Sequence, residues 1–321
     1  MGSQEDQLLE IIRQRCADGA GVVVGIGDDA AVVTPSPGAA LVCCTDTLVS
    51  GVHFPKQTSA RDIGYKSLAV NLSDLAAMGA SPRWALLALT MPHGDSQWLE
   101  EFLDGLQELA QEFGVTLIGG DLSAGPLVVS VQCLGELAGK SALRRGTGEA
   151  GDLIAVSGSL GRAAYALQCL KDGVTCDDAL AKALNRPQPR VQLGQALTGF
   201  ASSAIDISDG LLLDLERLLA ASGLGADIRL TNLPVDAVLE QLSDEKSWSF
   251  CLSGGDEYEL LFSLPPARRG DLERLAQALG IRLTVIGDIS SAPGIRCLRP
   301  DGGLYKPQAA GYQHFSDCEA E

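Results

Sequence analysis

Apolar and polar residues follow two different periods along the chain, one typical of helices and one of strands. Apolar residues recur every three or four positions over 60–78 and 96–113, a spacing that predicts two long helices. Apolar runs of strand length lie around them, at 39–45, 84–91 and 127–137. Because helices and short strands alternate throughout, we expect a mixed α/β protein and not a purely parallel, doubly wound sheet.

A stretch rich in glycine and basic residues, 139–151, interrupts this pattern and predicts a boundary between two domains. A length of 321 residues is enough for two domains of ordinary size. We therefore expect an N-terminal domain over 1–140 and a C-terminal α/β domain over 141–321. In the second domain the pattern predicts strands at 152–157, 203–207, 225–230, 257–264, 282–288 and 295–299, and helices at 162–171, 189–200, 211–222, 235–242 and 267–279.

The composition argues against several classes of partner. The net charge of −17 gives the protein a surface that repels nucleic acids and anionic membranes, so we expect neither as a partner. The sequence contains no apolar run of the ~18 residues that a membrane-spanning helix needs, and its first residues are too polar for a signal peptide. Nine cysteines without a C-x-x-C motif fit reduced thiols better than a disulfide framework or a zinc site. These features predict a cytoplasmic protein.

Aspartates at the ends of apolar runs and in glycine turns are the main chemical feature of the sequence. They occur in five motifs: GIGDDA (25–30), TDT (45–47), NLSD (71–74), GGD (119–121) and DISDG (206–210). Any one of these aspartates is about as well explained by a turn or a helix cap. Several carboxylates close together repel one another unless a divalent cation lies between them, and carboxylate, hydroxyl and carbonyl oxygens suit Mg²⁺. The five motifs together therefore predict a magnesium site.

Glycines beside these aspartates predict close contact with a phosphate. Gly119 and Gly120 allow backbone N–H groups to approach an anion, and Ser208 to Gly210 precede a helix whose N-terminus favours anions. The sequence contains neither a P-loop nor the motifs of protein kinases. The GSLG turn (158–161) lacks the third glycine of a dinucleotide-binding fingerprint, so we interpret it as structural. Acids and glycines in this combination favour phosphoryl transfer from a magnesium-bound nucleotide.

These motifs, in this order, resemble the thiamine-monophosphate kinase family over nearly the whole chain. The matching strings are GIGDDAAVV (25–33), TDTLVSGVHF (45–54), DIGYKSLAVNLSDLAAMGASP (62–82), LIGGD (117–121), ALRRG (142–146), PRVQLG (189–194), AIDISDGL (204–211), SGGDEYEL (253–260) and GYQHF (311–315). Some of them recur in aminoimidazole ribonucleotide synthetase, selenophosphate synthetase and a hydrogenase maturation protein of the same superfamily. TDTLVSGVHF, NLSDLAAMGA and GYQHF together indicate the thiamine branch.

The resemblance implies a two-domain fold like that of aminoimidazole ribonucleotide synthetase. The N-terminal domain would bind ATP and Mg²⁺ and would pair its sheet with that of a second subunit in a homodimer. The C-terminal layered α/β domain would complete the active-site cleft. An enzyme of this kind transfers the γ-phosphoryl group of ATP directly to thiamine monophosphate, with several Mg²⁺ ions, and gives thiamine diphosphate and ADP.

The resemblance also implies roles for individual residues. The expected metal ligands are Asp29, Cys44 (through its backbone carbonyl), Thr45 (through its hydroxyl or carbonyl), Asp46, Asp74, Asp121, Asp206 and Asp209. Nucleotide phosphates would contact Gly120, Asp121, Arg145 and Ser208. Thiamine phosphate would contact His53, Asp256 and Tyr312. Catalysis is expected to depend most on Asp46, Asp74, Asp121, Arg145 and Asp209.

Several alternatives stay open from the sequence. His53 could be a structural hydrogen-bonding residue, and Tyr312 could serve only to pack the tail. Where the family usually has Gly-Gly-Glu-Asp-Tyr-Glu, this chain has Gly-Gly-Asp-Glu-Tyr-Glu over 254–259, so either Asp256 or Glu257 could contact the substrate. The protein could also be a synthetase of the selenophosphate or aminoimidazole ribonucleotide type, or a nucleotide-binding scaffold without activity. Cys16 lies in a polar context that matches the reactive residue of selenophosphate synthetases poorly.

Overall fold

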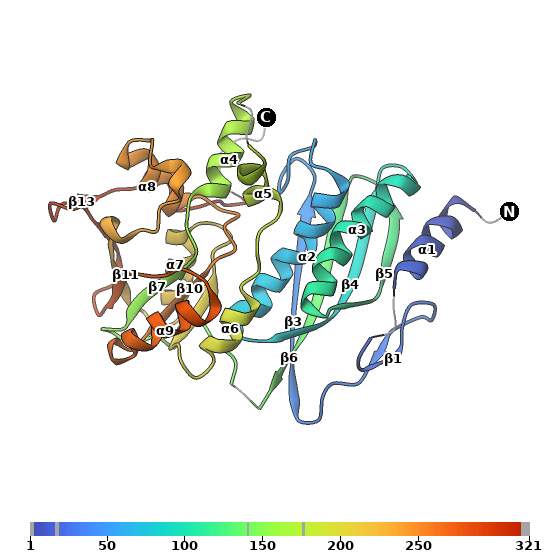
Figure 1. The fold of residues 1–321 in the computed structure, drawn as a ribbon, viewed down its shortest axis with the longest axis horizontal. Coiled ribbons are helices and arrows are strands. Elements are labelled where there is room, and N and C mark those ends of the chain that lie inside the picture. The colour runs from blue at the N-terminus through green and yellow to red at the C-terminus, as the bar shows by residue number, and fades with distance from the viewer. Residues whose placement is uncertain (1–2, 17–18, 140, 175–176, 316–321) are drawn as a thin grey trace. The chain divides into compact units, whose positions relative to one another are not determined.

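The computed structural model describes residues 3–16, 19–139, 141–174 and 177–315 of the chain. The chain divides into two compact units. The first unit comprises Met1–Ala142 and Asn185–Gln195, and the second comprises Leu143–Leu184 and Ala196–Glu321. Each unit contains both helices and a sheet, which confirms the predicted mixed α/β class (Figure 1).

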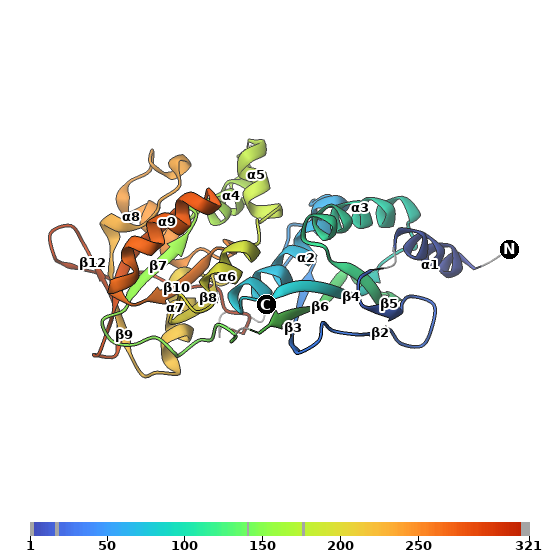
Figure 2. The same cartoon turned by 60° about the horizontal axis from the view of Figure 1, so that its bottom comes forward.

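The first unit is a four-stranded sheet with two long helices over one face (Figures 1 and 2). Its elements are α1 (Gln4–Arg15), β1 (Val22–Val24), β2 (Val32–Val33), β3 (Ala39–Val49), α2 (Ala60–Ala77), β4 (Ser81–Met91), α3 (Ser96–Phe113), β5 (Thr116–Ala124) and β6 (Val128–Ala138). The strand order is β3-β6-β4-β5, and only the β4–β5 pair is parallel. The two predicted long helices are thus confirmed as α2 and α3, and β3 and β5 form the two edges of the sheet.

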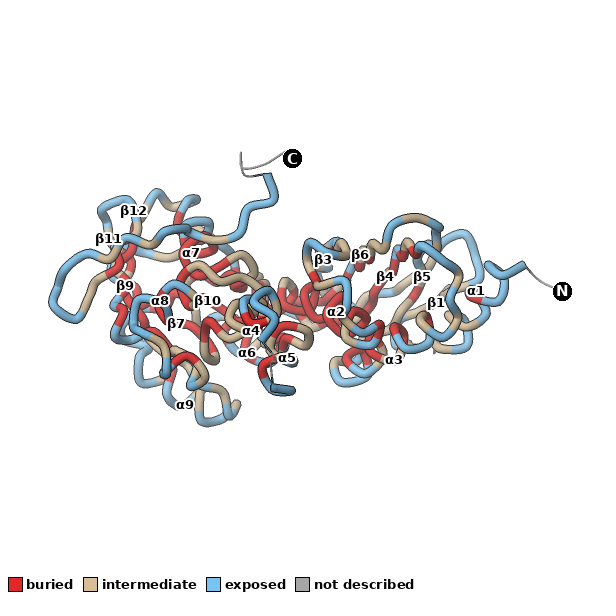
Figure 3. The backbone as a smooth tube through the Cα atoms, turned by 90° about the horizontal axis from the view of Figure 1, so that it is seen from above, coloured by how far each residue is buried: buried red, intermediate tan, exposed pale blue. Residues whose placement is uncertain are grey.

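Helix α2 is buried along almost its whole length, as the red tube in Figure 3 shows. Ser59 caps its N-terminus by accepting a hydrogen bond from the backbone N–H of Asp62. Two glycines let α2 approach α3 closely. A Cβ on Gly64 would lie 1.9 Å from the carbonyl oxygen of Phe102, and one on Gly105 would lie 1.8 Å from that of Arg61. A helix that is enclosed by a sheet and a second helix is expected to be apolar on all sides. Buried polar residues in α2, such as Lys66 and Asn71, therefore need an explanation of their own.

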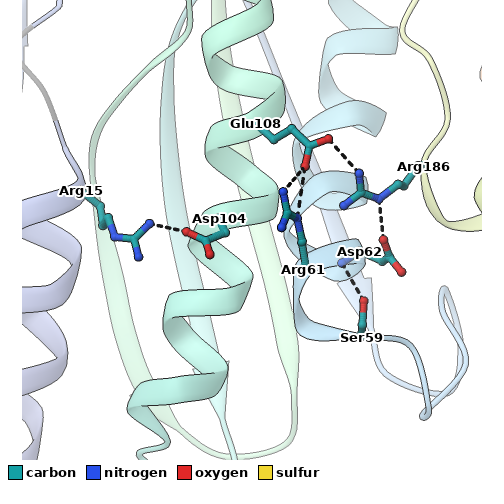
Figure 4. Close-up of polar contacts among 7 residues, drawn as sticks. All are labelled: Arg15, Ser59, Arg61, Asp62, Asp104, Glu108 and Arg186. Carbon is teal, nitrogen blue, oxygen red and sulfur yellow. Dashed lines mark hydrogen bonds and ion pairs between the residues drawn. The ribbon is translucent and has the colours of Figure 1, made fainter.

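A short stretch of chain from beyond residue 184 returns to the first unit. Arg186 donates to Asp62 at 2.5 Å and to Glu108 at 2.9 Å, and its guanidinium lies 4.9 Å from the ring centre of Tyr65 (Figure 4). Further along, a Cβ on Gly194 would lie 2.0 Å from the carbonyl oxygen of Ala76. The segment Asn185–Gln195 therefore packs along α2, although the residues before and after it belong to the second unit.

The second unit is built on a seven-stranded sheet in the order β13-β12-β9-β11-β7-β10-β8. Its strands are β7 (Leu153–Ser157), β8 (Ser203–Asp206), β9 (Gly225–Arg229), β10 (Leu260–Leu264), β11 (Leu283–Ser290), β12 (Gly294–Leu298) and β13 (Leu304–Tyr305). Its helices are α4 (Arg162–Lys171), α5 (Asp178–Asn185), α7 (Leu211–Ala220), α8 (Asp244–Ser253) and α9 (Arg269–Leu279), with short 3₁₀ turns at Leu230–Asn232, Ala237–Leu239 and Pro266–Arg268; α6 (Val191–Leu197) lies across the division between the units. All its strand pairs are antiparallel except β9–β12.

Two element predictions in this unit are wrong. The helix predicted over 235–242 is only the 3₁₀ turn Ala237–Leu239, where Asp236 accepts a hydrogen bond from the N–H of Val238, and a new helix, α8, begins after Ser243. The strand predicted over 257–264 begins only at Leu260, because Asp256 and Tyr258 have positive φ angles that a strand does not allow. The short strand β13 (Leu304–Tyr305) was not among the predicted strands.

Candidate active site

Asp46 on β3 and Asp74 on α2 lie around the thiol of Cys44 in the first unit. The Sγ atom of Cys44 lies 3.3 Å from the carbonyl oxygen of Asn71, which places this face of β3 against α2. Burial raises the pKa of the Cys44 thiol, and Cys133 and the charges of Asp74 and Asp46 raise it further. Burial also raises the pKa of the Cys133 thiol, and the same two carboxylates raise it further. Both thiols therefore stay protonated, and the oxygen atoms remain as ligands for a hard cation.

Thr45 and Asp121 lie on the other face of the same sheet. Successive side chains of a strand point to opposite faces, so Thr45 points away from the side of Asp46, and only its carbonyl oxygen could serve the same site. Residues in register share a face, and Asp121 pairs with Ala88, Ala88 with Ser130, and Ser130 with Thr47. Three strand spacings of ~4.8 Å separate the two edge strands, so Asp121 and Asp46 are ~14 Å apart and on opposite faces.

The residues around Cys44 fit a magnesium ion that is shared with a phosphate ligand. Among residues 3–16, 19–139, 141–174 and 177–315, no three His, Cys, Asp or Glu side chains are grouped so that they could hold a metal ion by themselves. Mg²⁺ in nucleotide sites is usually bound by one or two carboxylates, with phosphate oxygens and water completing its six ligands. A pair of carboxylates beside protonated thiols meets that requirement, and a closed protein cage is not needed.

His53 has a fixed ring orientation. Its Nδ1 atom accepts a hydrogen bond from the backbone N–H of Val49 at 3.0 Å, so the neutral ring carries its proton on Nε2. The carbonyl oxygen of the same residue accepts a hydrogen bond at 3.2 Å from Lys66, a lysine that is 1% exposed in the middle of α2. Sequence reasoning missed Lys66. A single lysine within the apolar run of α2 was the available signal, because a lysine is buried only when it has partners.

Asp29 and Gly120 have local structural explanations. Asp29 is exposed, and its backbone N–H donates to the carboxylate of the preceding Asp28 at 2.9 Å. Gly120 has φ 151°, and a Cβ there would lie 1.8 Å from the carbonyl oxygen of Leu87 on the neighbouring strand. Strand packing alone requires glycine at this position, so contact with a phosphate stays a prediction.

In the second unit, backbone hydrogen bonds hold three distant segments together around residues 206–209. The N–H of Asp256 donates to the carbonyl oxygen of Ser208 at 2.8 Å, and the N–H of Tyr312 donates to that of Asp209 at 2.9 Å. Asp206 ends β8 and is in register with Leu260 on β10. The structure thus brings together Asp206, Ser208, Asp209, Asp256 and Tyr312, although they come from three segments that are far apart in the sequence.

The turn before α7 is occupied by a side chain that was not predicted, that of Asp214. One of its carboxylate oxygens accepts hydrogen bonds from the N–H groups of Ser208, Asp209 and Gly210 at 3.0, 2.9 and 3.1 Å. These N–H groups already have a partner, so the turn does not offer them to a phosphate as expected. Burial raises the pKa of Asp214 to about 6, and the charges of Asp206 and Asp209 contribute. An acidic residue in the first turn of a helix often binds the free N–H groups at the start of that helix. The position of Asp214 in the predicted helix 211–222 was therefore the available signal for this contact.

Asp209 is paired with an arginine. Arg217 donates through Nη1 to Asp209 at 2.5 Å and to Asp214 at 2.8 Å. The guanidinium partly offsets the repulsion between these two carboxylates. A metal ion at Asp209 would therefore compete with a cation that the chain itself supplies.

The adjacent acids Asp256 and Glu257 have different surroundings. Both acids are half-buried, but the Oε1 atom of Glu257 accepts a hydrogen bond from the N–H of Gly161 at 2.9 Å at the start of α4. Burial raises the pKa of Glu257 well above its ordinary value. Asp256 lies beside Ser208. The carboxylate of Glu257 is thus turned toward α4, whereas Asp256 lies beside the turn that carries Asp209.

Tyr312 and Arg145 differ in how they relate to this cluster. The ring of Tyr312 is 45% exposed and meets His314 edge to face at 4.9 Å, beside the Asp209 turn. Arg145 lies between Arg144, which accepts a hydrogen bond from Ala204, and Gly146, which donates to Leu218. These contacts place its backbone near the C-terminal end of α7, whereas the 208–210 turn is at the N-terminal end.

Comparison with known proteins identifies the family. Residues 27–137 match the AIR synthase related protein N-terminal domain, and residues 149–298 match the C-terminal domain of the same name. The chain is 42% identical to the thiamine-monophosphate kinase of Escherichia coli over 301 residues, which are 92% of this chain and 93% of that protein. A crystal structure of the thiamine-monophosphate kinase of Stenotrophomonas maltophilia is 42% identical with a TM-score of 0.84 and covers 94% of this chain and 96% of that one.

A structure of AaThiL complexed with AMPPCP and TMP is 27% identical with a TM-score of 0.74, and the match covers 98% of this chain and 99% of that one. Together with the two domain matches, these likenesses confirm the predicted two-domain fold. They agree with the motifs that the sequence carries from GIGDD to GYQHF. The chain belongs to the thiamine-monophosphate kinase family.

Proposed function

We propose that the protein is a kinase that transfers the γ-phosphoryl group of ATP to thiamine monophosphate and yields thiamine diphosphate and ADP, a step of thiamine diphosphate biosynthesis. The likeness to AaThiL complexed with AMPPCP and TMP, over 98% of this chain, is the observation that carries the proposal. AMPPCP is an ATP analogue whose terminal phosphoryl group cannot be transferred. The pair thus corresponds to the two substrates held before reaction.

We propose that Asp46 and Asp74 hold Mg²⁺ together with the phosphates of ATP, and that Asp206 and Asp209 also serve as metal ligands. When bound, Mg²⁺ would offset the repulsion among these carboxylates and the two anionic substrates. The protonated thiols of Cys44 and Cys133 leave oxygen atoms as the donors, including the carbonyl oxygens of Cys44 and Thr45. Asp29 and Asp121 remain proposed ligands of the same kind.

The work of the protein in this reaction is to bind and orient the substrates. A phosphate monoester has its second pKa near 6, so its oxygen is already ionised at neutral pH and needs no general base. Arg145 would neutralise charge on the transferred group. Gly120 would contact nucleotide phosphates, and Ser208 would do so through its side-chain hydroxyl, because its N–H group is bound to Asp214.

Three residues are proposed for thiamine phosphate. His53 would donate from Nε2 to the phosphate, because its Nδ1 already accepts a hydrogen bond. The half-exposed ring of Tyr312 would stack on one of the two aromatic rings. The carboxylate of Asp256 would face the cationic thiazolium ring or the amino group of the pyrimidine.

We also propose a homodimer formed through the N-terminal sheet. Leu41 is 43% exposed and Cys43 is exposed, and both point to the face of the sheet opposite α2. Apolar side chains on an open sheet face favour pairing with a second copy. We place the enzyme in the cytoplasm, because its cysteines fit reduced thiols. In the part of the chain that the structure describes, no helix is long and apolar enough to cross a membrane.

The test of the function is an assay of purified protein with ATP, Mg²⁺ and thiamine monophosphate, with products separated by chromatography. The proposal predicts thiamine diphosphate and ADP in equal amounts, and loss of both with excess EDTA. A scaffold would bind ATP without turnover. A synthetase of the related types would leave thiamine monophosphate unchanged, and either outcome would refute the proposal.

A further inference from the structure

The loop between α8 and β10 has backbone conformations that side chains other than glycine rarely adopt. Asp256 has φ 65° and Tyr258 has φ 51°, and within the described residues these two are the non-glycine positions with positive φ. Such a conformation is strained for a residue with a Cβ atom, and the strain persists only where neighbouring contacts hold the chain firmly. The residue between them, Glu257, is the place to look for such contacts.

Glu257 fixes the loop from the inside of the unit. Its buried carboxylate accepts hydrogen bonds from the N–H groups of Gly161, at 2.9 Å, and Ala163. The first N–H groups of a helix have no partner within the helix, so this carboxylate caps α4. Glu257 thereby ties the strained loop to a helix that begins almost a hundred residues earlier in the chain.

Three further hydrogen bonds fix the loop near the residues that are proposed to bind the substrate. The N–H groups of Asp256 and Tyr258 donate to the carbonyl oxygens of Ser208 and Ile207, both at 2.8 Å. The hydroxyl of Tyr258 donates to the Oδ1 atom of Asp256 at 3.3 Å, and Tyr258 itself is 8% exposed. The carboxylate of Asp256 is thus held in place by its own neighbour, beside the turn that carries Asp209.

We propose that Glu257 and Tyr258 are positioning residues that hold the carboxylate of Asp256 in the orientation that binds thiamine phosphate. This inference rests on the proposed function. Glu257 anchors the loop to α4, and Tyr258 orients the carboxylate directly. The division of roles also assigns the two adjacent acids in this chain: Glu257 faces the protein and Asp256 faces the substrate.

The test compares Tyr258→Phe and Glu257→Gln with the wild type. Tyr258→Phe removes a single hydroxyl from a ring that stays packed, and Glu257→Gln keeps the size of the side chain but brings an NH₂ group to two N–H donors. Asp152→Asn is the matched control. Asp152 is 5% exposed and accepts the N–H of Glu149 at 3.1 Å, and it precedes Leu153, which pairs with Leu264 at the far end of β10.

The readouts are kcat, KM for each substrate, the dissociation constant of thiamine phosphate by calorimetry, and the midpoint of thermal unfolding. Tyr258→Phe is expected to raise KM and Kd for thiamine phosphate by about 3–10-fold, the effect of losing one ordinary hydrogen bond, because Tyr258 orients Asp256 and does not itself bind the substrate. KM for ATP and the unfolding midpoint should not change. Glu257→Gln should raise the same two constants by about tenfold or more, and Asp152→Asn should leave them unchanged.

The outcomes separate this inference from the proposed function. A wild-type protein that does not bind thiamine phosphate would overturn both. A wild type that binds it, with Tyr258→Phe within twofold in Kd, would overturn the positioning role alone. Equal increases in KM for ATP and for thiamine phosphate would have the same meaning. If Glu257→Gln does not fold, the result for Tyr258→Phe decides.

Discussion

The Nδ1 atom of His53 accepts a hydrogen bond from the backbone N–H of Val49 at 3.0 Å. Because the chain itself supplies this donor four residues earlier, the ring is oriented before any ligand arrives, and Nε2 is its donor. We expect His53→Ala to raise KM for thiamine phosphate about tenfold, since it removes a hydrogen bond to a charged phosphate. KM for ATP should stay the same. Steady-state kinetics with each substrate varied in turn would measure both constants.

His93→Ala is the control for this substitution, because His93 is exposed after the end of β4. It should leave both constants at their wild-type values. If His53→Ala also leaves KM for thiamine phosphate unchanged, the bond to Val49 is structural only, which is the alternative that the sequence left open.

Asp46→Asn and Asp74→Asn should each lower kcat at saturating substrates by about 100-fold or more while the protein stays folded. The reason is that each carboxylate is proposed to bind Mg²⁺, and an amide oxygen is a weaker ligand without charge. The concentration of Mg²⁺ that gives half of the maximal rate should rise in both variants. Asp104→Asn, on α3 and paired with Arg15, is the control and should behave as the wild type. Rates near normal in either variant would count against the metal site.

Arg186 is expected to stabilise the first unit far more than Arg15 does. Arg186 is 18% exposed and binds two carboxylates, whereas Arg15 is more exposed and binds Asp104 (Figure 4). Arg186 also lies over the ring of Tyr65. Removing the arginine of a partly buried network leaves carboxylates without a partner. We expect Arg186→Ala to lower the free energy of unfolding by about 2–3 kcal/mol and Arg15→Ala by less than about 1 kcal/mol. Urea unfolding followed by circular dichroism would measure both, and equal losses would contradict the assignment.

Glu257 should give the protein a pH-dependent stability with a definite sign. Burial raises the pKa of Glu257 in the folded state well above its ordinary value of 4.5, so the folded protein binds this proton more tightly than the unfolded chain does. The free energy of unfolding should therefore fall as pH rises from about 4.5 through the raised pKa. Glu257→Gln carries no such proton. The free energy of unfolding of the wild type minus that of the variant should fall as pH rises over this window. A rise in this quantity would contradict the assigned direction.

The local pattern of apolar residues was enough to predict the two long helices. The acid motifs around Asp46 and Asp74 were enough to assign these two residues to one expected magnesium site. Helix α2 follows from its apolar spacing, its cap at Ser59 and the glycine after its end. Asp46 on β3 and Asp74 on α2 both lie near the Cys44 thiol, because this face of β3 packs against α2. For Asp121 the pattern was insufficient. Asp121 lies on β5 and Asp46 lies on β3, and these strands are at opposite edges of the sheet. The strand order is set by contacts between distant segments, which a local pattern does not show.

The second unit shows the opposite limit of sequence reasoning. The motif around Ser208 predicts a turn before a helix, and the structure has one. However, Asp214 accepts hydrogen bonds from the N–H groups that were expected to bind a phosphate. Positive φ angles at Asp256 and Tyr258 run against the preferences of both residues. The hydrogen bond from the N–H of Gly161 to Glu257 ties this loop to the start of α4, and that contact joins residues too far apart for a local pattern to show.

The most direct test of the central claim follows a radioactive label from the γ-phosphate of ATP. The protein would be incubated with γ-labelled ATP, Mg²⁺ and thiamine monophosphate, and the label located by chromatography. Direct transfer predicts that the label appears in the terminal phosphate of thiamine diphosphate, one for each ADP formed. Label found only in inorganic phosphate or retained in ATP, from protein that is folded and binds both substrates, would contradict the account.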